Sequence, residues 1–449
     1  MVTTSILESD GRSGQNGGIV CGKVQRIMGL AHLDEGKAMR ILLLSQWFDP
    51  EPHFKGLPFA KALRDLGHEV QVVTGFPNYP GGKVYPGYKL RLFQREILDG
   101  IPVLRVLLYP SHDRSGLRRI LNYVSFAISA SLFGTLLSKP ADIIYVYHPP
   151  ATVGLPAIVM KFIKRAPYVY DIQDLWPESV EASGMTNSKM VLRLLGLWCR
   201  LVYHLADRIV VLSPGFKEAL KSKGVLGERI DVIYNWCDDT AVSTECVDER
   251  LADELGLAGR FNIVFAGTMG KGQGLEAVLD AAEIVYRKQP AIQFVFIGGG
   301  TEVDNLKRRA ETKGLSNVLF LERRPVSEIW KILSLADVLL VHLKDDPLFE
   351  ITIPSKTQAY MAAGKPILMG VKGDAGRLVR AADAGVTCVP GNPSSIAESA
   401  CSLLSMPKED LKKFGANGRG FYETHLCLRV GAKAFERVFF DVLRKRSLE

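Results

Sequence analysis

The chain has 449 residues, 47% hydrophobic and 23% charged, which is close to the average for soluble globular proteins. The length predicts two or three domains, and the composition excludes a disordered or collagen-like chain. Its 7 cysteines are scattered without a CxxC pair, which excludes a zinc ribbon and favours a reducing compartment over a disulfide framework. The formal charge of +8 favours an anionic partner, either a nucleotide or a membrane surface, while the lack of long Lys/Arg runs argues against nucleic acid.

The first 38 residues are small, polar and aperiodic, and they lack the apolar core and cleavage site of a signal peptide. At Met39 the sequence changes to the apolar run MRILLLSQ. We therefore expect the fold to begin at Met39. Residues 1–38 are then either a disordered extension or the product of an over-assigned start site.

Residues 39–235 alternate short apolar runs with amphipathic stretches. Such alternation predicts a parallel sheet covered on both faces by helices, that is, a Rossmann-like doubly wound α/β domain. Strands are predicted at 40–45, 69–74, 102–108, 142–147, 167–171, 207–212 and 229–233, and helices at 57–66, 150–164, 189–205 and 215–223.

Residues 236–260 are polar and acidic, and we interpret them as an interdomain linker. The alternation then restarts, which predicts a second Rossmann-like α/β domain at 261–425, followed at 426–449 by a C-terminal helix that can pack back on the first domain. Strands are predicted at 261–266, 292–297, 317–321, 337–342, 365–369 and 386–389, and helices at 273–287, 302–313, 326–334, 355–363, 373–383 and 394–405.

The segment 114–137 has three interpretations. Arg118 and Arg119 precede a run of 18 residues without charge, which is at the lower limit for crossing a bilayer. The segment can be a helix buried in the domain, or an interfacial helix with Arg114, Arg118 and Arg119 at lipid phosphates on a cytoplasmic membrane surface. A transmembrane span is disfavoured by its serines, threonine and asparagine.

Parallel sheets bind ligands at the carboxyl ends of their strands, so motifs on strand-to-helix loops are candidate sites. Gly56 opens a helix and can admit a polar ligand group to the helix N-terminus, or it is a plain turn. His148 ends a strand, where it can contact a sugar hydroxyl or share a proton, or it is structural. Asp171, Asp174 and Trp176 follow the next strand and offer carboxylates and an aromatic platform to a saccharide; the carboxylates can instead cap a helix.

Two motifs of the second domain predict an anion site. The loop AGTMGKGQGL contains Gly267 and Lys271, and it can place backbone N–H groups and an ammonium on a diphosphate, although it is not a P-loop. The stretch IPSKTQAYMAAGKP starts a helix in which Ser355 and Lys356 occupy the first turn, with Glu350 just before it. The alternative for Ser355 and Lys356 is a helix cap and a solvated lysine.

No Asp-x-Asp, HExxH or Cys/His cluster occurs in the sequence. Enzymes that hold a nucleotide diphosphate through a metal usually supply such ligands. We therefore predict a site without a metal and without a cofactor, in which cations and helix N-termini neutralise the phosphates.

The motifs AGTMGKGQGL, FIGGG and PSKTQAYMAAGKPI resemble the GT-B glycosyltransferases of family 4. DIQDLWPESV, VLSPGFKEAL and IYNWCD are similar to bacterial O-antigen and capsule enzymes of the N-acetyl-L-fucosamine transferase-like group. The resemblance implies two Rossmann-like domains that face each other across a cleft, with the acceptor on the first and the nucleotide on the second. It also implies retaining transfer from a nucleotide-diphosphate sugar without a metal.

The resemblance implies roles for individual residues, with two departures. Many family members carry a Glu-x7-Glu pair, whereas here Glu350 is followed by Gln358, and Thr268 replaces an arginine that often follows the first strand of the second domain. The expected catalytic residues are His148, Glu350 and Lys356; the expected nucleotide-sugar ligands are Gly56, Gly267, Thr268, Lys271, Gly298, Arg324 (with its neighbour Arg323), Ser355, Lys356 and Gln358; and the expected acceptor ligands are Asp171, Asp174 and Trp176.

The expected function is transfer of an N-acetylated sugar from a UDP-sugar to a polyprenyl-diphosphate-linked saccharide at the cytoplasmic face of the cell membrane, in O-antigen or capsule synthesis. A sugar-nucleotide 2-epimerase and a catalytically degenerate binding partner in polysaccharide assembly are the alternatives. An NAD-dependent oxidoreductase is disfavoured, because neither domain has GxGxxG followed by a suitably spaced acidic residue.

Overall fold

A computed structural model describes residues 37–448, apart from 54, 112–115, 183–184, 187, 240–241 and 243–247. The expected extension, residues 1–38, lies almost wholly outside the described residues. So does Arg114, one of the three arginines assigned to a membrane surface.

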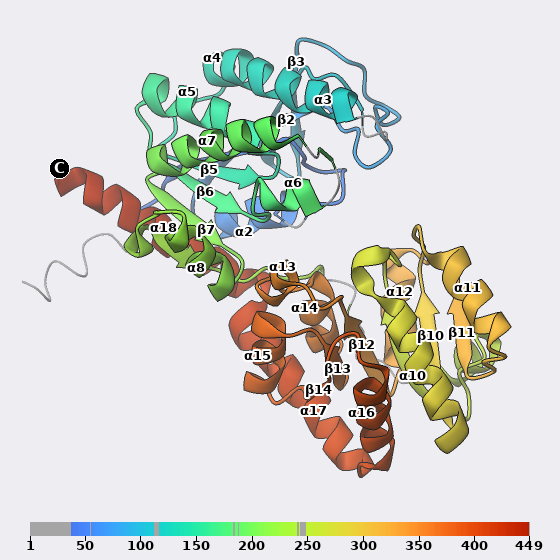
Figure 1. Ribbon diagram of the computed structural model, residues 1–449. Coiled ribbons are helices and arrows are strands. Elements are labelled where there is room, and N and C mark those ends of the chain that lie inside the picture. Colours follow the sequence, from blue (N-terminus) through green and yellow to red (C-terminus); the bar gives the residue numbers. More distant parts are fainter. Residues whose placement is uncertain are drawn as a thin grey trace, which may run out of the picture. The chain divides into compact units, whose positions relative to one another are not determined.

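The first α/β unit is built on an eight-stranded sheet in the order β3-β4-β2-β1-β5-β6-β7-β8 (Figure 1). All neighbours pair in parallel except β3, which runs antiparallel to β4. The strands are β1 (Arg40–Leu44), β2 (Glu69–Gly75), β3 (Phe93–Leu98), β4 (Ile101–Val106), β5 (Ile143–His148), β6 (Tyr168–Ile172), β7 (Arg208–Val211) and β8 (Ile230–Val232).

Helices cover both faces of this sheet, because successive strand residues point to opposite sides. Leu42 and Leu44 of β1 face a core shared with α3, α5 and α7, whereas Ile41 and Leu43 face α2 and α18. The helical elements are α2 (Leu57–Asp65), α3 (Gly116–Ser129), the π-helical η1 (Ala130–Gly134), α4 (Thr135–Leu137), η2 (Ala151–Val153), α5 (Gly154–Lys164), α6 (Glu178–Ala182), α7 (Lys189–Leu205), α8 (Pro214–Ser222) and η3 (Gly227–Arg229).

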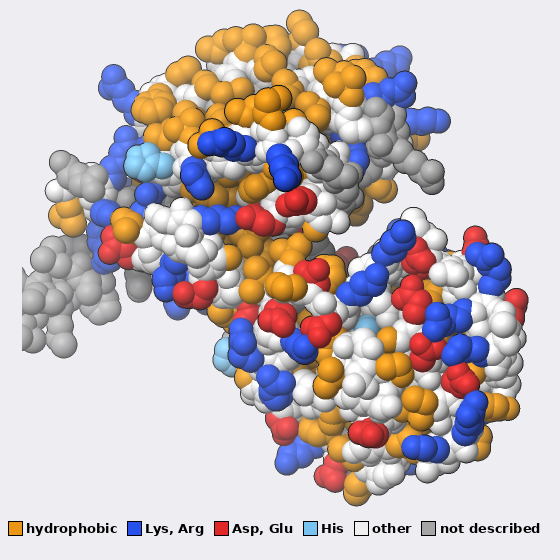
Figure 2. Space-filling model, viewed as in Figure 1, with side chains coloured by type: hydrophobic (Ala, Val, Ile, Leu, Met, Phe, Trp, Pro, Cys, Tyr) orange, Lys and Arg blue, Asp and Glu red, His pale blue; other side chains and the backbone are white. Residues whose placement is uncertain are grey.

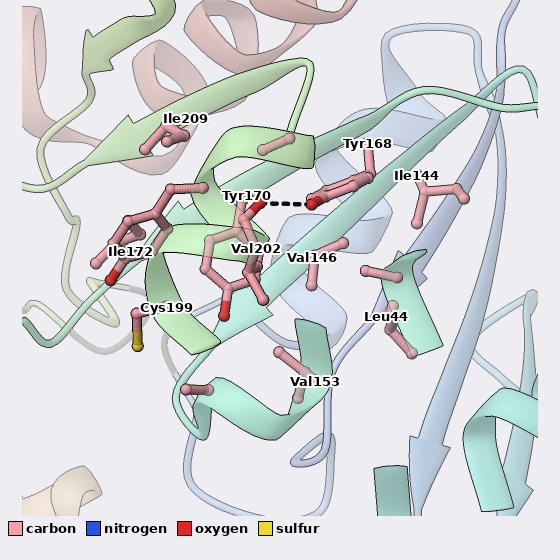
Figure 3. Close-up of a cluster of buried hydrophobic side chains, with 14 of the residues drawn as sticks. Leu44, Ile144, Val146, Val153, Tyr168, Tyr170, Ile172, Cys199, Val202 and Ile209 are labelled. Atoms are coloured by element: carbon pink, nitrogen blue, oxygen red, sulfur yellow. Dashed lines mark hydrogen bonds between the residues drawn. The ribbon is translucent and has the colours of Figure 1, made fainter. Parts of the chain in front are cut away.

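Figure 3 shows the core on the α7 side of the sheet, where aliphatic side chains of β5 and β6 meet Val202 and Cys199 of α7. The hydroxyl of Tyr168 donates a hydrogen bond of 2.6 Å to the backbone carbonyl of Val202 (Figure 3). This bond satisfies a polar group that would otherwise be buried without a partner, and it fixes α7 along the sheet.

The second α/β unit has six parallel strands in the order β11-β10-β9-β12-β13-β14. They are β9 (Phe261–Ala266), β10 (Ile292–Ile297), β11 (Val318–Leu321), β12 (Val338–His342), β13 (Ile367–Gly370) and β14 (Gly385–Thr387). The helical elements are α9 (Glu249–Glu254), η4 (Lys271–Gln273), α10 (Leu275–Lys288), α11 (Val303–Thr312), α12 (Val326–Ser334), α13 (Pro347–Glu350), α14 (Ser355–Ala362), α15 (Gly373–Ala381), α16 (Pro393–Ser405), α17 (Lys408–Phe421), η5 (Tyr422–Leu426) and α18 (Leu428–Leu448).

The expectation of wholly parallel sheets is wrong at one edge. Sequence analysis missed β3, whose residues FQREIL are half exposed along their length. An edge strand of this kind lacks the continuous apolar run by which the buried parallel strands were recognised. It pairs antiparallel to β4 through the short turn at Asp99–Gly100.

The C-terminal helix α18 packs on the first sheet around a buried ion pair. Lys55 Nζ lies 2.5 Å from Asp171 Oδ2, and both side chains are fully buried. The Tyr145 hydroxyl donates to the same carboxylate oxygen at 2.6 Å. The ring of Phe435 from α18 covers the Lys55 ammonium at 4.7 Å, so the pair sits under the helix that closes this face.

We predict that Lys55→Met destabilises the protein by about 3–5 kcal/mol, because it leaves the Asp171 carboxylate buried without its cation. The free energy of unfolding, measured by urea denaturation, checks this prediction. The control is Lys61→Met, which breaks the exposed Lys61–Asp99 pair and is expected to cost about 1 kcal/mol or less. Equal losses for the two variants would contradict a structural role for the buried pair.

Candidate functional site

A cavity of about 650 Å³ opens at the carboxyl ends of β9 and β10, where a parallel sheet is expected to bind ligands. The loops after both strands, α12 and the first turns of α14 contribute to its wall. The lining residues are Cys237, Asp238, Ala266, Gly267, Thr268, Ile297, Gly298, Gly299, Gly300, Arg323, Arg324, Ile329, Trp330, Leu333, Ser355, Lys356, Ala359 and Tyr360.

Two glycine loops form the floor of the cavity, backbone against backbone. Gly267 and Gly298 both have φ of +137°, a conformation that residues with a side chain rarely adopt. A Cβ on Gly298 would lie 2.1 Å from the carbonyl oxygen of Gly267. The Gly267 N–H donates to the Ile297 carbonyl at 2.8 Å, so the two loops are held together at this spacing.

Lys356 supplies a cation to the cavity. Its aliphatic stem runs across Gly267, where an added Cβ would lie 2.6 Å from Lys356 Cε. Its ammonium lies 4.6 Å from the centre of the Phe265 ring. No acidic side chain pairs with it among the described residues, and burial lowers the pKa of Lys356 to about 8.

The start of α14 adds to this positive potential. Ser355 and Lys356 form its first turn, no side chain caps this end, and both residues line the cavity. The Tyr360 hydroxyl accepts a 2.9 Å hydrogen bond from the Ala266 N–H and so holds α14 against the end of β9. A helix N-terminus and a lysine ammonium that face the same space form a site for an anion.

The cavity also contains residues that sequence analysis did not assign to the site. Trp330 is 7% exposed, and its indole Nε1–H has no hydrogen-bond partner in the described part of the chain. On an amphipathic helix a tryptophan is interpreted as a core residue, so the sequence gives no signal that places Trp330 at the cavity wall. Cys237 and Asp238, expected in the linker, also line the cavity.

Two predicted nucleotide-sugar ligands, Lys271 and Gln358, and the predicted catalytic residue Glu350 lie elsewhere. Lys271 is exposed on η4 and Glu350 is exposed on α13, and neither lines the cavity. Gln358 is buried, and its side-chain amide fits a 2.9 Å hydrogen bond to the Pro354 carbonyl, so it closes the start of its own helix. The next residue of α14, Ala359, lines the cavity instead.

His148 is fully buried at the end of β5 between aromatic rings. The Tyr170 and Trp176 rings each lie 5.6 Å from the imidazole, and neither ring nitrogen has a hydrogen-bond partner within the described ranges. Burial lowers the pKa of His148 to about 3. The imidazole is therefore neutral near pH 7, which disfavours the predicted proton-sharing role and leaves it a neutral donor or acceptor.

The predicted acceptor ligands after β6 are mostly structural. Asp171 is sealed in the ion pair with Lys55, and its second oxygen accepts a 2.7 Å hydrogen bond from Gln173. Trp176 is 8% exposed and packs in the core against Tyr123. Neither side chain has a free surface for a saccharide, so the acceptor role fails for both, and only Asp174 is exposed.

The helix N-terminus behind Gly56 is already occupied. The Asp49 carboxylate accepts a 2.6 Å hydrogen bond from the Leu57 N–H, at the start of α2. A Cβ on Gly56 would lie 2.2 Å from the same carboxylate oxygen. Gly56 thus admits an internal carboxylate, not the ligand group that sequence analysis expected there.

Two family models match the chain in succession. Residues 57–236 match the glycosyl transferase 4-like domain, and residues 248–421 match the glycosyl transferases group 1 domain. Together they cover most of the chain, and the cavity lies mainly within the second. Among the described residues, no group of three or more His, Cys, Asp or Glu is arranged to hold a metal ion.

Relatives and solved structures agree with these matches. WbjE of Pseudomonas aeruginosa, described as a glycosyltransferase, is 27% identical over 330 residues, which span 72% of this chain and 81% of WbjE. WcaI of Escherichia coli, described as a glycosyl transferase of colanic acid biosynthesis, is 29% identical over 312 residues, 67% of this chain and 75% of WcaI. HepE of Anabaena, solved with UDP-glucose, superposes with a TM-score of 0.65 at 18% identity, covering 90% of this chain and 100% of HepE.

We predict that Gly298→Ala destabilises the second unit by about 3 kcal/mol or more, because of the strained φ and the collision with Gly267. The neighbouring Gly299 is a matched control, since a Cβ there meets no atom within 4 Å. Gly299→Ala is expected to change stability by about 0.5 kcal/mol or less. Thermal denaturation compares the two, and similar losses would contradict the close-packed glycine floor.

Proposed function

Because this chain belongs to the GT-B glycosyltransferases of polysaccharide biosynthesis, we propose that it transfers an N-acetylated sugar from a UDP-sugar to a polyprenyl-diphosphate-linked saccharide. The observation that carries the proposal is the Lys356 ammonium, which faces a glycine-floored cavity without an acidic partner in the described part of the chain. A nucleoside diphosphate would supply the negative charge that pairs with the Lys356 ammonium, and its shape would suit the cavity.

The proposed role of Lys356 is to stabilise the departing UDP. Negative charge grows on the diphosphate as the sugar leaves, and a fixed cation and helix N-terminus in a partly dry cavity favour that state over the bound donor. Arg323 and Arg324 are exposed at the cavity wall, where they can add to the positive potential or stack on the base.

Retention of configuration is proposed through a front-face reaction. The bond from the anomeric carbon to the UDP oxygen breaks, the bond to the acceptor oxygen forms on the same face, and the acceptor proton passes to the leaving phosphate. Asp238 is the single carboxylate among the described residues that line the cavity, so the wall offers little choice of protein nucleophile. We place the reaction at the cytoplasmic face of the membrane, because the proposed acceptor is lipid-linked.

A catalytically degenerate binding partner is the second candidate, and the position of Gln358 favours it. Its amide closes the start of α14 and does not line the cavity, so this residue, which was expected to be a nucleotide-sugar ligand, is not available to the donor. Such a protein would bind UDP without turning over a UDP-sugar.

We predict that Lys356→Ala lowers turnover of the UDP-sugar by at least about 100-fold, as removal of one stabilising group of a leaving anion typically does. UDP release in the presence of a lipid-linked saccharide extract measures it. Lys331→Ala, an exposed lysine on α12 outside the cavity lining, is the control and should stay within about fivefold of wild type. Near-wild-type activity of Lys356→Ala would refute the proposed role.

We also predict that UDP binding weakens as the pH rises through about 8, the pKa of Lys356 in the unliganded protein. The ammonium attracts the diphosphate below this pH and is lost above it, so the dissociation constant should rise by up to about tenfold per pH unit. Isothermal titration between neutral and alkaline pH measures the profile. Lys356→Arg stays charged throughout and should give a flat profile; a bend that persists in this variant would assign the titration to another group.

A further inference from the structure

The helices on one side of the first sheet have apolar side chains on their outward sides as well as their inward sides. The outward set is exposed by 58–70% and comes from α3 and α4, from α5 and from α7. We call this surface the outer helical face. Its most exposed members are Leu117, Ile128, Leu136, Phe162, Ile163, Met190 and Leu194.

The outer helical face is one continuous surface. Phe126 of α3, Met160 of α5 and Val202 of α7 are all buried in the same core, so the three helices form one layer on the sheet. Within this layer α5 contacts α3 on one side and α7 on the other. Figure 2 shows hydrophobic side chains gathered over the region where Figure 1 places α4, α5 and α7. Apolar patches of this extent mark binding surfaces.

The charge on this layer has a single sign. Residues 116–137, 154–164 and 189–205 contain no Asp or Glu, but they contain seven Lys or Arg residues. Lys189, Arg193 and Arg200 of α7 are exposed, and no acid pairs with them among the described residues. Lys161 of α5, by contrast, pairs with Asp207 at 2.8 Å, so its charge is already compensated.

We propose that the outer helical face docks on a lipid bilayer that contains anionic lipids. The apolar side chains of α3, α4, α5 and α7 would enter the acyl boundary, and Arg118, Lys189, Arg193 and Arg200 would meet lipid phosphates. The inference rests on the proposed function in one respect, which is that a lipid-linked acceptor requires the enzyme to be at the membrane. It extends the surface beyond the segment 114–137 to α5 and α7.

The charge favours a bilayer over a second copy of the chain. A twofold contact through this face would set one basic surface against another and bury Lys189, Arg193 and Arg200 together with their counterparts. An anionic bilayer supplies the missing negative charge.

The structure also favours docking on the bilayer over crossing it. Residues 116–137 are long and apolar enough to span a membrane, with a mean hydropathy of 1.6, but 44% of that window is buried inside the protein. Tyr123, Phe126 and Ala130 belong to the core of the sheet. Withdrawing the helix into a membrane would open that core, whereas a bilayer surface can be met with the domain intact.

The test is flotation of the full chain with vesicles of phosphatidylcholine, alone or mixed in equal parts with phosphatidylglycerol. We expect binding to the mixed vesicles, much weaker binding to the neutral ones, and weakening by salt. Arg193→Gln with Arg200→Gln should reduce binding to the mixed vesicles by roughly fivefold per residue. Lys288→Gln with Lys307→Gln, two exposed lysines of the second unit, is the control for charge removal and should bind as wild type does.

A matched pair of variants tests the apolar contribution. Leu194 on the outer helical face and Leu226 between α8 and η3 are both 59% exposed, so neither substitution by glutamate empties a core. Leu194→Glu should weaken vesicle binding at least about tenfold, since it removes an inserted side chain and adds a charge that the lipids repel. Leu226→Glu should bind as wild type does.

Equal binding of the two leucine variants, or equal binding to neutral and anionic vesicles, would overturn the proposal. So would a wild-type dimer that ignores vesicles and is split by Leu194→Glu, because the face would then join two copies. UDP binding is measured on the same preparations. If vesicles do not bind while UDP does, this inference alone fails; if vesicles bind while UDP does not, it is supported and the proposed donor is contradicted.

Discussion

A lysine ammonium that faces a cavity, with no carboxylate paired to it in the described part of the chain, is the feature on which the proposed activity depends. Transfer of a charge from water into a partly dry site costs free energy unless an anion compensates it. Lys356 lies over the Phe265 ring, and the lowered pKa reflects that cost. The glycine floor is part of the same feature, since a side chain on Gly267 would occupy the path of the lysine stem. The loops, the lysine and the helix N-terminus therefore together make up the anion site that we propose.

A second buried lysine shows the opposite solution. Lys55 is paired with Asp171 inside the first unit, and the Tyr145 hydroxyl and the Phe435 ring complete its surroundings. This pair is closed to ligands and ties the C-terminal helix to the first sheet. Lys55 is buried and paired with an acid, whereas Lys356 lines the cavity and has no acid paired with it among the described residues.

The sequence predicts most of the strands and the positions of the glycine loops well, because these depend on local spacing, while the anion site at the start of α14 stays a prediction. It fails where a residue's role depends on a distant partner. From the sequence, Asp171 is interpreted as a ligand at the end of a strand. The fold shows instead that Lys55, 116 residues away in the chain, lies beside it. Trp330 lines the cavity, whereas the Gln358 side chain turns back to its own helix. The direction of each side chain decides this, and the periodicity of the sequence does not give that direction. The outward leucines of α7 have the same helical spacing as core positions, so only the fold distinguishes them.

The account is tested most directly by the shift in melting temperature with UDP, GDP, ADP and NAD, each in the presence of EDTA. A ligand at 100 times its dissociation constant adds about 2.7 kcal/mol to stability, which a thermal scan detects. The melting temperature is expected to rise with UDP in the presence of EDTA and to stay unchanged with the other three. A rise that requires a divalent cation, a rise with GDP or ADP alone, or no rise with any of the four would contradict it.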